Sequence, residues 1–114
     1  MSDWLDTRFC QEFGVRVPIV QTGMGWVSGA RLTAATAEAG GLGILAAVTM
    51  STEEMVTAID RVRSRTTASF GVNLRPDQAD LPQRIDALVE RGVRVVSFAG
   101  APQRATVDRL QAAG

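Results

Sequence analysis

Residues 18–46, PIVQTGMGWVSGARLTAATAEAGGLGILA, decide the fold of this chain of 114 residues. Their order predicts a buried strand, a Gly-Met-Gly loop, an Ala-rich helix, a Gly-Gly turn and a second buried strand. Near-continuous apolar and β-branched residues are typical of strands buried on both faces of a parallel sheet. The stretch therefore predicts a βα unit whose first loop has little side-chain bulk, so that a flat ligand can lie against its backbone.

The βα pattern repeats along the whole chain. Strands are predicted at four apolar runs and helices in the segments that follow them, with one short helix ahead of the first strand. The units share their length but little of their sequence, so they do not indicate a solenoid. The predicted strands cover residues 17–21, 42–46, 69–74 and 94–98, and the predicted helices cover 30–39, 52–65, 81–91 and 102–113.

Helix-end signals support these boundaries. Ser51 with Glu54 predicts a capping box, and Asp80 with Gln83 predicts a second one. Gly92 stands where a left-handed C′ residue is expected. The residues expected to face the core are Leu32, Ala35 and Ala39 in the first of these helices, Met55, Ile59 and Val62 in the second, and Ile85, Leu88 and Val89 in the third.

The fold class is therefore α/β, with four βα units in the order (βα)4 and parallel strands. Two architectures accommodate four such units. One is a small open doubly wound sheet, for which about 110 residues suffice. The other is half of a TIM (β/α)8 barrel, which as a whole needs about 250 residues.

Composition excludes several classes of chemistry and partner. The chain contains no histidine and no tyrosine, and all twelve basic residues are arginine, so it has no Schiff-base lysine and no Ser-His-Asp arrangement. A single cysteine and no histidine exclude the usual metal-ligand clusters. The net charge of zero predicts neither nucleic acid nor a membrane surface as a partner. One unpaired cysteine and no signal peptide or membrane helix predict a cytoplasmic protein.

The loops after the strands are the places to look for a ligand site, because parallel sheets bind ligands at the carboxyl ends of their strands. In the first loop, Gly23, Met24 and Gly25 resemble the start of a dinucleotide fingerprint, but the third glycine, Gly29, comes one position late and no acidic residue ends the second strand. Glycines let backbone N–H groups approach a ring edge, and a flavin offers acceptors there. The alternative interpretation is a plain tight turn between strand and helix.

Asn73 ends the third predicted strand, where its amide can donate to and accept from a ring or a ribityl group. The alternative is an Asx-type turn into Arg75-Pro76. Small residues at 97–100 leave room either for a ligand or for a turn. Trp26 either walls a substrate pocket or covers the end of the barrel, and Arg75 either binds an anion or is solvated. Cys10 has no base beside it and is predicted to be structural.

Three segments in this order, PIVQTGMG at 18–25, AGGLG at 39–43 and FGVN at 70–73, resemble the nitronate monooxygenase family, also called 2-nitropropane dioxygenase-like. The related flavin-type enoyl-acyl carrier protein reductases share these segments. The resemblance runs from about residue 14 to residue 114. It implies that residues 1–114 form the N-terminal half of an FMN-binding TIM-barrel domain, and so favours the half-barrel over the open sheet.

The resemblance also implies roles for particular residues. The backbone around Met24 and Gly25 is expected to face the isoalloxazine ring of FMN, and Asn73 to hydrogen-bond the cofactor. Gly23 is expected to serve the shape of the site, and the turn at 40–43 to lie at the opposite end of the barrel. The family's phosphate-binding loops and histidine-bearing segment follow the fourth strand, so no catalytic residue and no metal ligand is expected within these 114 residues.

Three functions are compatible with the sequence. The first is FMN-dependent oxidation of an alkyl nitronate with O2 to a carbonyl compound and nitrite. The second is flavin-dependent reduction of an enoyl thioester with NAD(P)H. The third is a truncated, non-catalytic half-barrel. A small-molecule substrate is expected in the first two cases, and the isolated chain is expected to be inactive unless a second copy or a missing C-terminal half completes it.

Overall fold

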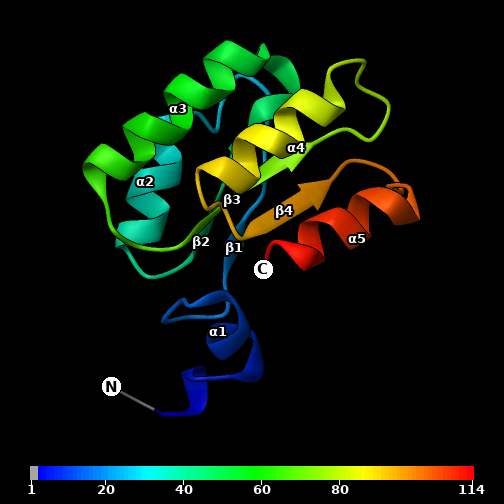
Figure 1. The fold of residues 1–114 in the computed structure, drawn as a ribbon. Coiled ribbons are helices and arrows are strands. Elements are labelled where there is room, and N and C mark those ends of the chain that lie inside the picture. The colour runs from blue at the N-terminus through cyan, green and yellow to red at the C-terminus, as the bar shows by residue number, and fades with distance from the viewer. Residues whose placement is uncertain (1–2) are drawn as a thin grey trace.

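The structure is a computed structural model that describes residues 3–114. Parallel strands alternate with helices along the chain (Figure 1). The strands are β1 (Val20–Gln21), β2 (Leu42–Ala46), β3 (Phe70–Leu74) and β4 (Val95–Phe98). The helices are α1 (Arg8–Phe13), α2 (Ala30–Glu38), α3 (Thr52–Arg65), α4 (Leu81–Glu90) and α5 (Arg104–Ala112), with short 3-10 helices η1 (Asp3–Leu5) and η2 (Ala47–Thr49).

The order of the strands decides between the two predicted architectures. They lie in the sheet in the order β1-β2-β3-β4, each paired in parallel with the next in sequence. A doubly wound sheet reverses its strand order at a switch point, and no reversal occurs among these strands. Helices α2, α3 and α4 lie together on one side of the sheet (Figure 1). The prediction of a half-barrel is confirmed, and the open doubly wound sheet is excluded.

The two faces of the sheet have different residues. Leu45 and Val72 are register partners, fully buried in the core, and their neighbour Val96 packs against the same cluster. Successive residues of a strand point to opposite faces. Ala46 and Asn73 therefore point to the face away from the helices, which is the face that lines the interior in a closed barrel.

The buried face of α2 differs from the predicted one. The buried residues are Thr33, Ala34 and Ala37, whereas Ala35 and Ala39 are exposed and Leu32 is half-buried. The cause lies in β2, where a Cβ atom on Gly43 would lie 2.4 Å from the backbone oxygen of Thr33. Because Gly43 has no side chain, α2 approaches β2 with its backbone, and this contact sets the rotation of the helix. An Ala-rich helix has too weak an apolar stripe to show that rotation in its sequence.

Strand β1 is shorter and more exposed than predicted. The ladder includes only Val20 and Gln21, and the side chains of Ile19 and Val20 are 63% and 40% exposed. Pro18 has no N–H to donate, and the N–H of Val17 donates to Gly40 outside the ladder. β1 is also an edge strand with one neighbour. The prediction of a strand buried on both faces is therefore wrong for this edge of the sheet.

One of the two predicted capping boxes forms. The Ser51 hydroxyl accepts from the N–H of Glu54 at 3.1 Å, and the Glu54 carboxylate accepts from the N–H of Ser51 at 2.9 Å. At α4 the Asp80 side chain caps no backbone N–H, so the second box is wrong. The carboxylate of Asp80 accepts instead from Arg84 and from Thr52. The guanidinium four residues further on and the hydroxyl of Thr52 in α3 thus take this carboxylate in place of the backbone N–H groups.

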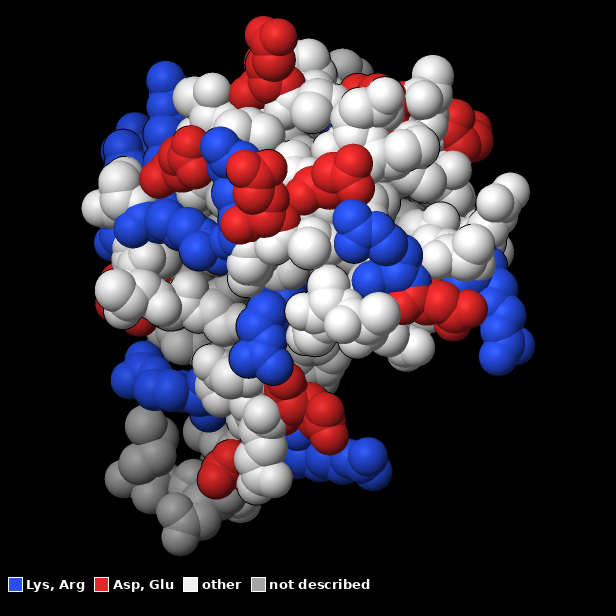
Figure 2. Space-filling view, viewed as in Figure 1, with Lys and Arg blue, Asp and Glu red and all other residues white. Residues whose placement is uncertain are grey.

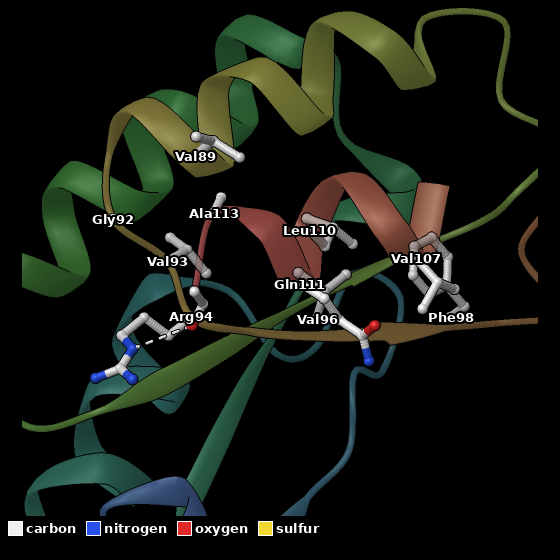
Figure 3. A pocket seen from close by; sticks show the side chains of 11 residues that line it. Val89, Gly92, Val93, Arg94, Val96, Phe98, Val107, Leu110, Gln111 and Ala113 are labelled. Atoms are coloured by element: carbon white, nitrogen blue, oxygen red, sulfur yellow. Dashed lines mark hydrogen bonds between the residues drawn. The ribbon is translucent and has the colours of Figure 1, made fainter. Parts of the chain in front are cut away.

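Helix α5 covers the other edge of the sheet loosely. None of its residues is buried. A crevice of about 460 Å³ separates it from β4 and the end of α4 (Figure 3), with Val96, Phe98, Val107 and Leu110 in its walls. Val96 and Phe98 belong to the helix-covered face. The crevice is therefore incomplete packing around the last helix, on the face opposite Asn73.

The surface carries charges of both signs. On the face shown in Figure 2, acidic and basic side chains alternate over the helices. Oppositely charged side chains pair at places on the surface, as Arg109 and Asp86 do at 2.8 Å. None of the helices found between residues 3 and 114 has the length and apolar character needed to cross a bilayer.

Candidate functional site

A row of small and polar residues crosses the carboxyl ends of three strands. Ala46, Asn73 and Ser97 are register partners across β2, β3 and β4. The Asn73 amide nitrogen donates to the Ser97 hydroxyl oxygen at 2.9 Å. A serine hydroxyl both donates and accepts, so this contact suits either orientation of the amide. Asn73 is thereby held in place while its second polar atom remains available.

The Gly-Met-Gly loop comes down onto this row. A Cβ atom on Gly23 would lie only 2.6 Å from the Cβ of Asn73. Strands β1 and β3 are not neighbours in the sheet, so the loop after β1 passes over the end of β2 to reach Asn73. The structure therefore brings Gly23 and Asn73, both predicted site residues, into direct contact.

Ser28 fixes the shape of the loop. Its side chain is fully buried, and its hydroxyl oxygen accepts from the N–H of Met24 at 2.6 Å. The carbonyl of Met24 accepts from the N–H groups of Val27 and Ser28, each at 2.9 Å. Both backbone polar groups of Met24 are therefore used inside the loop, while the residue itself is 39% exposed. Of the two residues whose backbone is expected to face the ring, Met24 has its N–H bonded to Ser28, whereas the N–H of Gly25 has no acceptor among residues 3–114, and the contact of either with a cofactor stays a prediction.

Trp26 stands out in the same loop. Its backbone has φ +60°, in the left-handed region that side-chain-bearing residues seldom occupy, and its side chain is 89% exposed. Neighbouring Val27 is 63% exposed. The loop thus presents the side chains of Trp26 and Val27 outward, while Gly23 contacts Asn73 and Gly25 lies beside Thr49. The two interpretations of Trp26, as the wall of a substrate pocket or as a cover for the end of the barrel, both stay predictions.

Two polar groups at the carboxyl ends of the strands, the Gly25 N–H and the free polar atom of Asn73, suit the edge of a flavin ring. Gln21 is the register partner of Gly43, which faces α2, so its buried and unpartnered Oε1 lies on the helix-covered face and is not part of this site. In the first loop, the N–H of Gly25 has no acceptor among residues 3–114. This donor and the free polar atom of Asn73 suit a ring that carries both donor and acceptor groups along one edge. Arg75, the basic residue that follows Asn73 most closely in the sequence, is paired with Asp77 at 2.6 Å on the exposed surface. The residues fit the ring portion of FMN and not its phosphate.

Acid is expected to destabilise the chain. Hydrogen bonds from Arg84 and Thr52 lower the pKa of Asp80, and those from the backbone and side chain of Ser51 lower the pKa of Glu54. With folded-state pKa values below the unfolded ones, the unfolded chain binds more protons at acidic pH, so stability rises with pH. The two carboxylates contribute their full stabilisation at pH values above their pKa in the unfolded chain, which is about 4. This stabilisation is lost as the pH falls through their lower pKa values in the folded chain.

Urea unfolding followed by circular dichroism between pH 7 and pH 2 measures this dependence. Asp80→Asn should lower stability at neutral pH and flatten the acid limb of the curve, because the titrating group is gone. Asp77→Asn is the matched control, since it removes an exposed carboxylate whose ion pair with Arg75 lies on the surface. Equal acid limbs in Asp80→Asn and the parent chain would contradict the assignment.

Sequence reasoning missed several residues that shape the site. Ser28 is four positions after Met24, a spacing at which a hydroxyl can return to the backbone, and that was its only signal. Thr49 lies in the loop after β2, where a Cβ on Gly25 would be 3.0 Å from its methyl group. Its place beside Gly25 depends on the packing of two loops and has no signal in the sequence.

Comparison with known proteins supplies the family. The profile of the family described as nitronate monooxygenase matches residues 7–87. A (3aS,4S,5R,7aS)-5-hydroxy-7a-methyl-1-oxo-octahydro-1H-indene-4-carboxyl-CoA dehydrogenase of Mycobacterium tuberculosis is 51% identical over 110 residues. That match covers 96% of this chain and 31% of the relative, so the chain spans about a third of the relative's length.

Two solved structures share the fold. FabK from Thermotoga maritima superposes with a TM-score of 0.90 at 30% identity, covering 95% of this chain and 35% of that one. Nitroalkane oxidase from Streptomyces ansochromogenes gives a TM-score of 0.81 at 32% identity, covering 95% and 40%. Four parallel strands alternating with helices thus form one half of the barrel seen in these longer chains.

Proposed function

Since the chain belongs to the nitronate monooxygenase family of flavin-type oxidoreductases, we propose that it forms the ring-binding wall of an FMN site in an oxidoreductase that acts on an acyl-CoA thioester. The observation that carries the proposal is the contact of Gly23 with Asn73 at the carboxyl ends of the strands. This contact leaves an uncharged, small-residue surface bordered by unpaired polar atoms, where a flat ring can lie.

Each predicted cofactor residue has a distinct part in this proposal. Gly23 leaves space for the Asn73 side chain. The N–H of Gly25 and the free polar atom of Asn73 hydrogen-bond the ring edge, and the Met24 side chain covers its plane. When bound, FMN supplies the acceptor for a hydride or an electron pair, and the protein orients the substrate and excludes water.

The choice of substrate class rests on the degree of identity. The dehydrogenase named for a bicyclic carboxyl-CoA is 51% identical over 96% of this chain. A probable nitronate monooxygenase of Staphylococcus aureus is 37% identical over 62% of it. A thioester of a bulky alicyclic acid is therefore the first candidate. Oxidation of an alkyl nitronate is the second, favoured by the family profile and the nitroalkane oxidase structure.

The proposal includes a partner that completes the barrel. Strands β1 and β4 each have one neighbour in the sheet, and unpaired edges invite another strand. The partner is either the C-terminal half of the same kind of barrel or a second copy of this chain. In the second case β1 of each copy pairs with β4 of the other.

Flavin titration tests the proposal on the chain itself. FMN and riboflavin are added separately, free flavin is removed by desalting, and the retained visible absorbance is measured with the mass in solution. A phosphate contact is worth about 1.5–3 kcal/mol, at least about tenfold in affinity. Since the ring wall has no such contact, both flavins should bind within about threefold of each other. If the desalted chain retains no visible absorbance after FMN and none after riboflavin, these residues do not form a flavin site.

Substrate class is decided by mixing the flavin-bound protein, without oxygen, with an alicyclic acyl-CoA and separately with an alkyl nitronate. Loss of the visible flavin absorbance with the thioester alone supports the first candidate. Loss of the visible flavin absorbance with the alkyl nitronate alone supports the second candidate and contradicts the first.

A further inference from the structure

The loop after β2, residues 47–50, forms one side of the proposed site and has little structure of its own. It contains the single 3-10 turn of η2, closed by the N–H of Met50 donating to the carbonyl of Ala47 at 3.1 Å. Thr49 of this loop would contact a Cβ on Gly25 at 3.0 Å. The position of the loop therefore limits the space beside the Gly-Met-Gly loop, and something outside the loop must fix it.

Arg84, on α4, makes that connection. Its side chain is buried, with 3% of the residue exposed. One guanidinium nitrogen, Nη1, donates to the carbonyl of Ala47 at 2.8 Å, and the other, Nη2, donates to the carbonyl of Met50. The fork of the guanidinium thus holds both ends of the loop at once, which a single ammonium group cannot do.

The arginine is itself held in position. Its Nε donates to Asp80 Oδ1 at 2.9 Å, and the other oxygen of Asp80 accepts from the Thr52 hydroxyl at 2.6 Å. The Gln78 amide adds a contact to the carbonyl of Val48 at 3.4 Å. Three carbonyls of loop 47–50 are therefore bound by side chains that follow β3.

This arrangement exceeds what packing requires. A buried charge is expensive, and an apolar side chain of similar volume fills a core at least as well. What the guanidinium adds is a fixed geometry for two carbonyls. Such directional support is what a ligand site needs when its wall is a loop.

We propose that Arg84 is a positioning residue that fixes loop 47–50 against the Gly-Met-Gly loop and so keeps the flavin wall in its binding geometry. The inference rests on the proposed function for its effect on the ligand, and on the hydrogen bonds alone for its effect on the loop.

The test compares Arg84→Met and Arg84→Lys with Val62→Ala, in the whole chain. Val62 is fully buried in α3, so its truncation lowers stability through a cavity and removes none of the loop contacts. The hydrogen-exchange rate of the Met50 amide measures local opening of the loop, and the exchange rate of the Ile59 amide measures opening of the core. Arg84→Met should raise exchange at Met50 by at least about tenfold more than Val62→Ala does, since exchange reports local opening. Arg84→Lys keeps the charge and loses the fork, so its exchange rate at Met50 should lie between those of Arg84→Met and the parent chain. If Arg84→Met does not fold, Arg84→Lys replaces it in the comparison with Val62→Ala.

FMN affinity provides the second readout. Arg84→Met should weaken it by about tenfold, and Val62→Ala by no more than about twofold at temperatures where both remain folded. Equal exchange at Met50 in the Arg84 variants and Val62→Ala would overturn the proposal, as would equal loss of FMN affinity. A parent chain that binds no flavin would refute the proposed function, and the exchange comparison would then still decide whether Arg84 fixes the loop.

Discussion

Gly43→Ala is expected to destabilise the chain by about 3 kcal/mol, at the upper end of the usual range for overpacking. The new Cβ atom would lie 2.4 Å from the backbone oxygen of Thr33 and 3.1 Å from its carbonyl carbon. Because these are backbone atoms of α2, no side-chain rotation relieves the contact. The helix must move away from β2, and the buried contacts of Ala34 and Ala37 move with it.

Alanine substitutions at two further glycines allow the predicted losses of stability to be ranked, with the free energy of unfolding measured in urea. At Gly71 an added Cβ would meet a side-chain atom of Val95 at 3.1 Å and its carbonyl oxygen at 3.2 Å, which small shifts can relieve in part. At Gly29 it would meet nothing within 4 Å. The expected order of destabilisation is Gly43→Ala, then Gly71→Ala, then Gly29→Ala. A Gly43→Ala chain as stable as Gly29→Ala would show that α2 is not held by this backbone contact.

The regular alternation of strands and helices was predictable because its signals are local. The capping box at Ser51 and the apolar stripe of Met55, Ile59 and Val62 were both confirmed. Errors arose where a distant residue decided the outcome. The rotation of α2 follows from Gly43 in β2. The role of Asp80 depends on Thr52 in α3 and on Arg84, whose guanidinium is bound to the carbonyls of Ala47 and Met50.

The site shows the same division. Gly23, Met24, Gly25 and Asn73 were identified from loop position and family resemblance, and their contact with a cofactor stays a prediction. The structure adds that Gly23 touches Asn73 and that Ser28 occupies the amide of Met24. Neither contact has a sequence signal strong enough to predict it, because both depend on how the first loop folds over the end of β2.

Gly23→Ala should weaken flavin binding by about tenfold or more while leaving the fold intact. Its Cβ would lie 2.6 Å from the Cβ of Asn73 and 3.0 Å from its Cγ. These are the first atoms of the side chain, so Asn73 must turn away or the loop must rise. Turning of Asn73 breaks its 2.9 Å hydrogen bond to Ser97, and rising of the loop moves the Gly25 N–H away from the proposed position of the ring.

Gly29→Ala in the same loop is the matched control, because its added methyl group has free space and its φ of −81° suits alanine. FMN titration gives the affinities, and the side-chain amide resonances of Asn73 report its position without any cofactor. If these resonances shift in Gly23→Ala and not in Gly29→Ala while FMN affinity stays unchanged in both, Asn73 is displaced without consequence and does not bind the flavin. If both change together in Gly23→Ala alone, the contact between the first loop and the third strand is what builds the ring-binding wall.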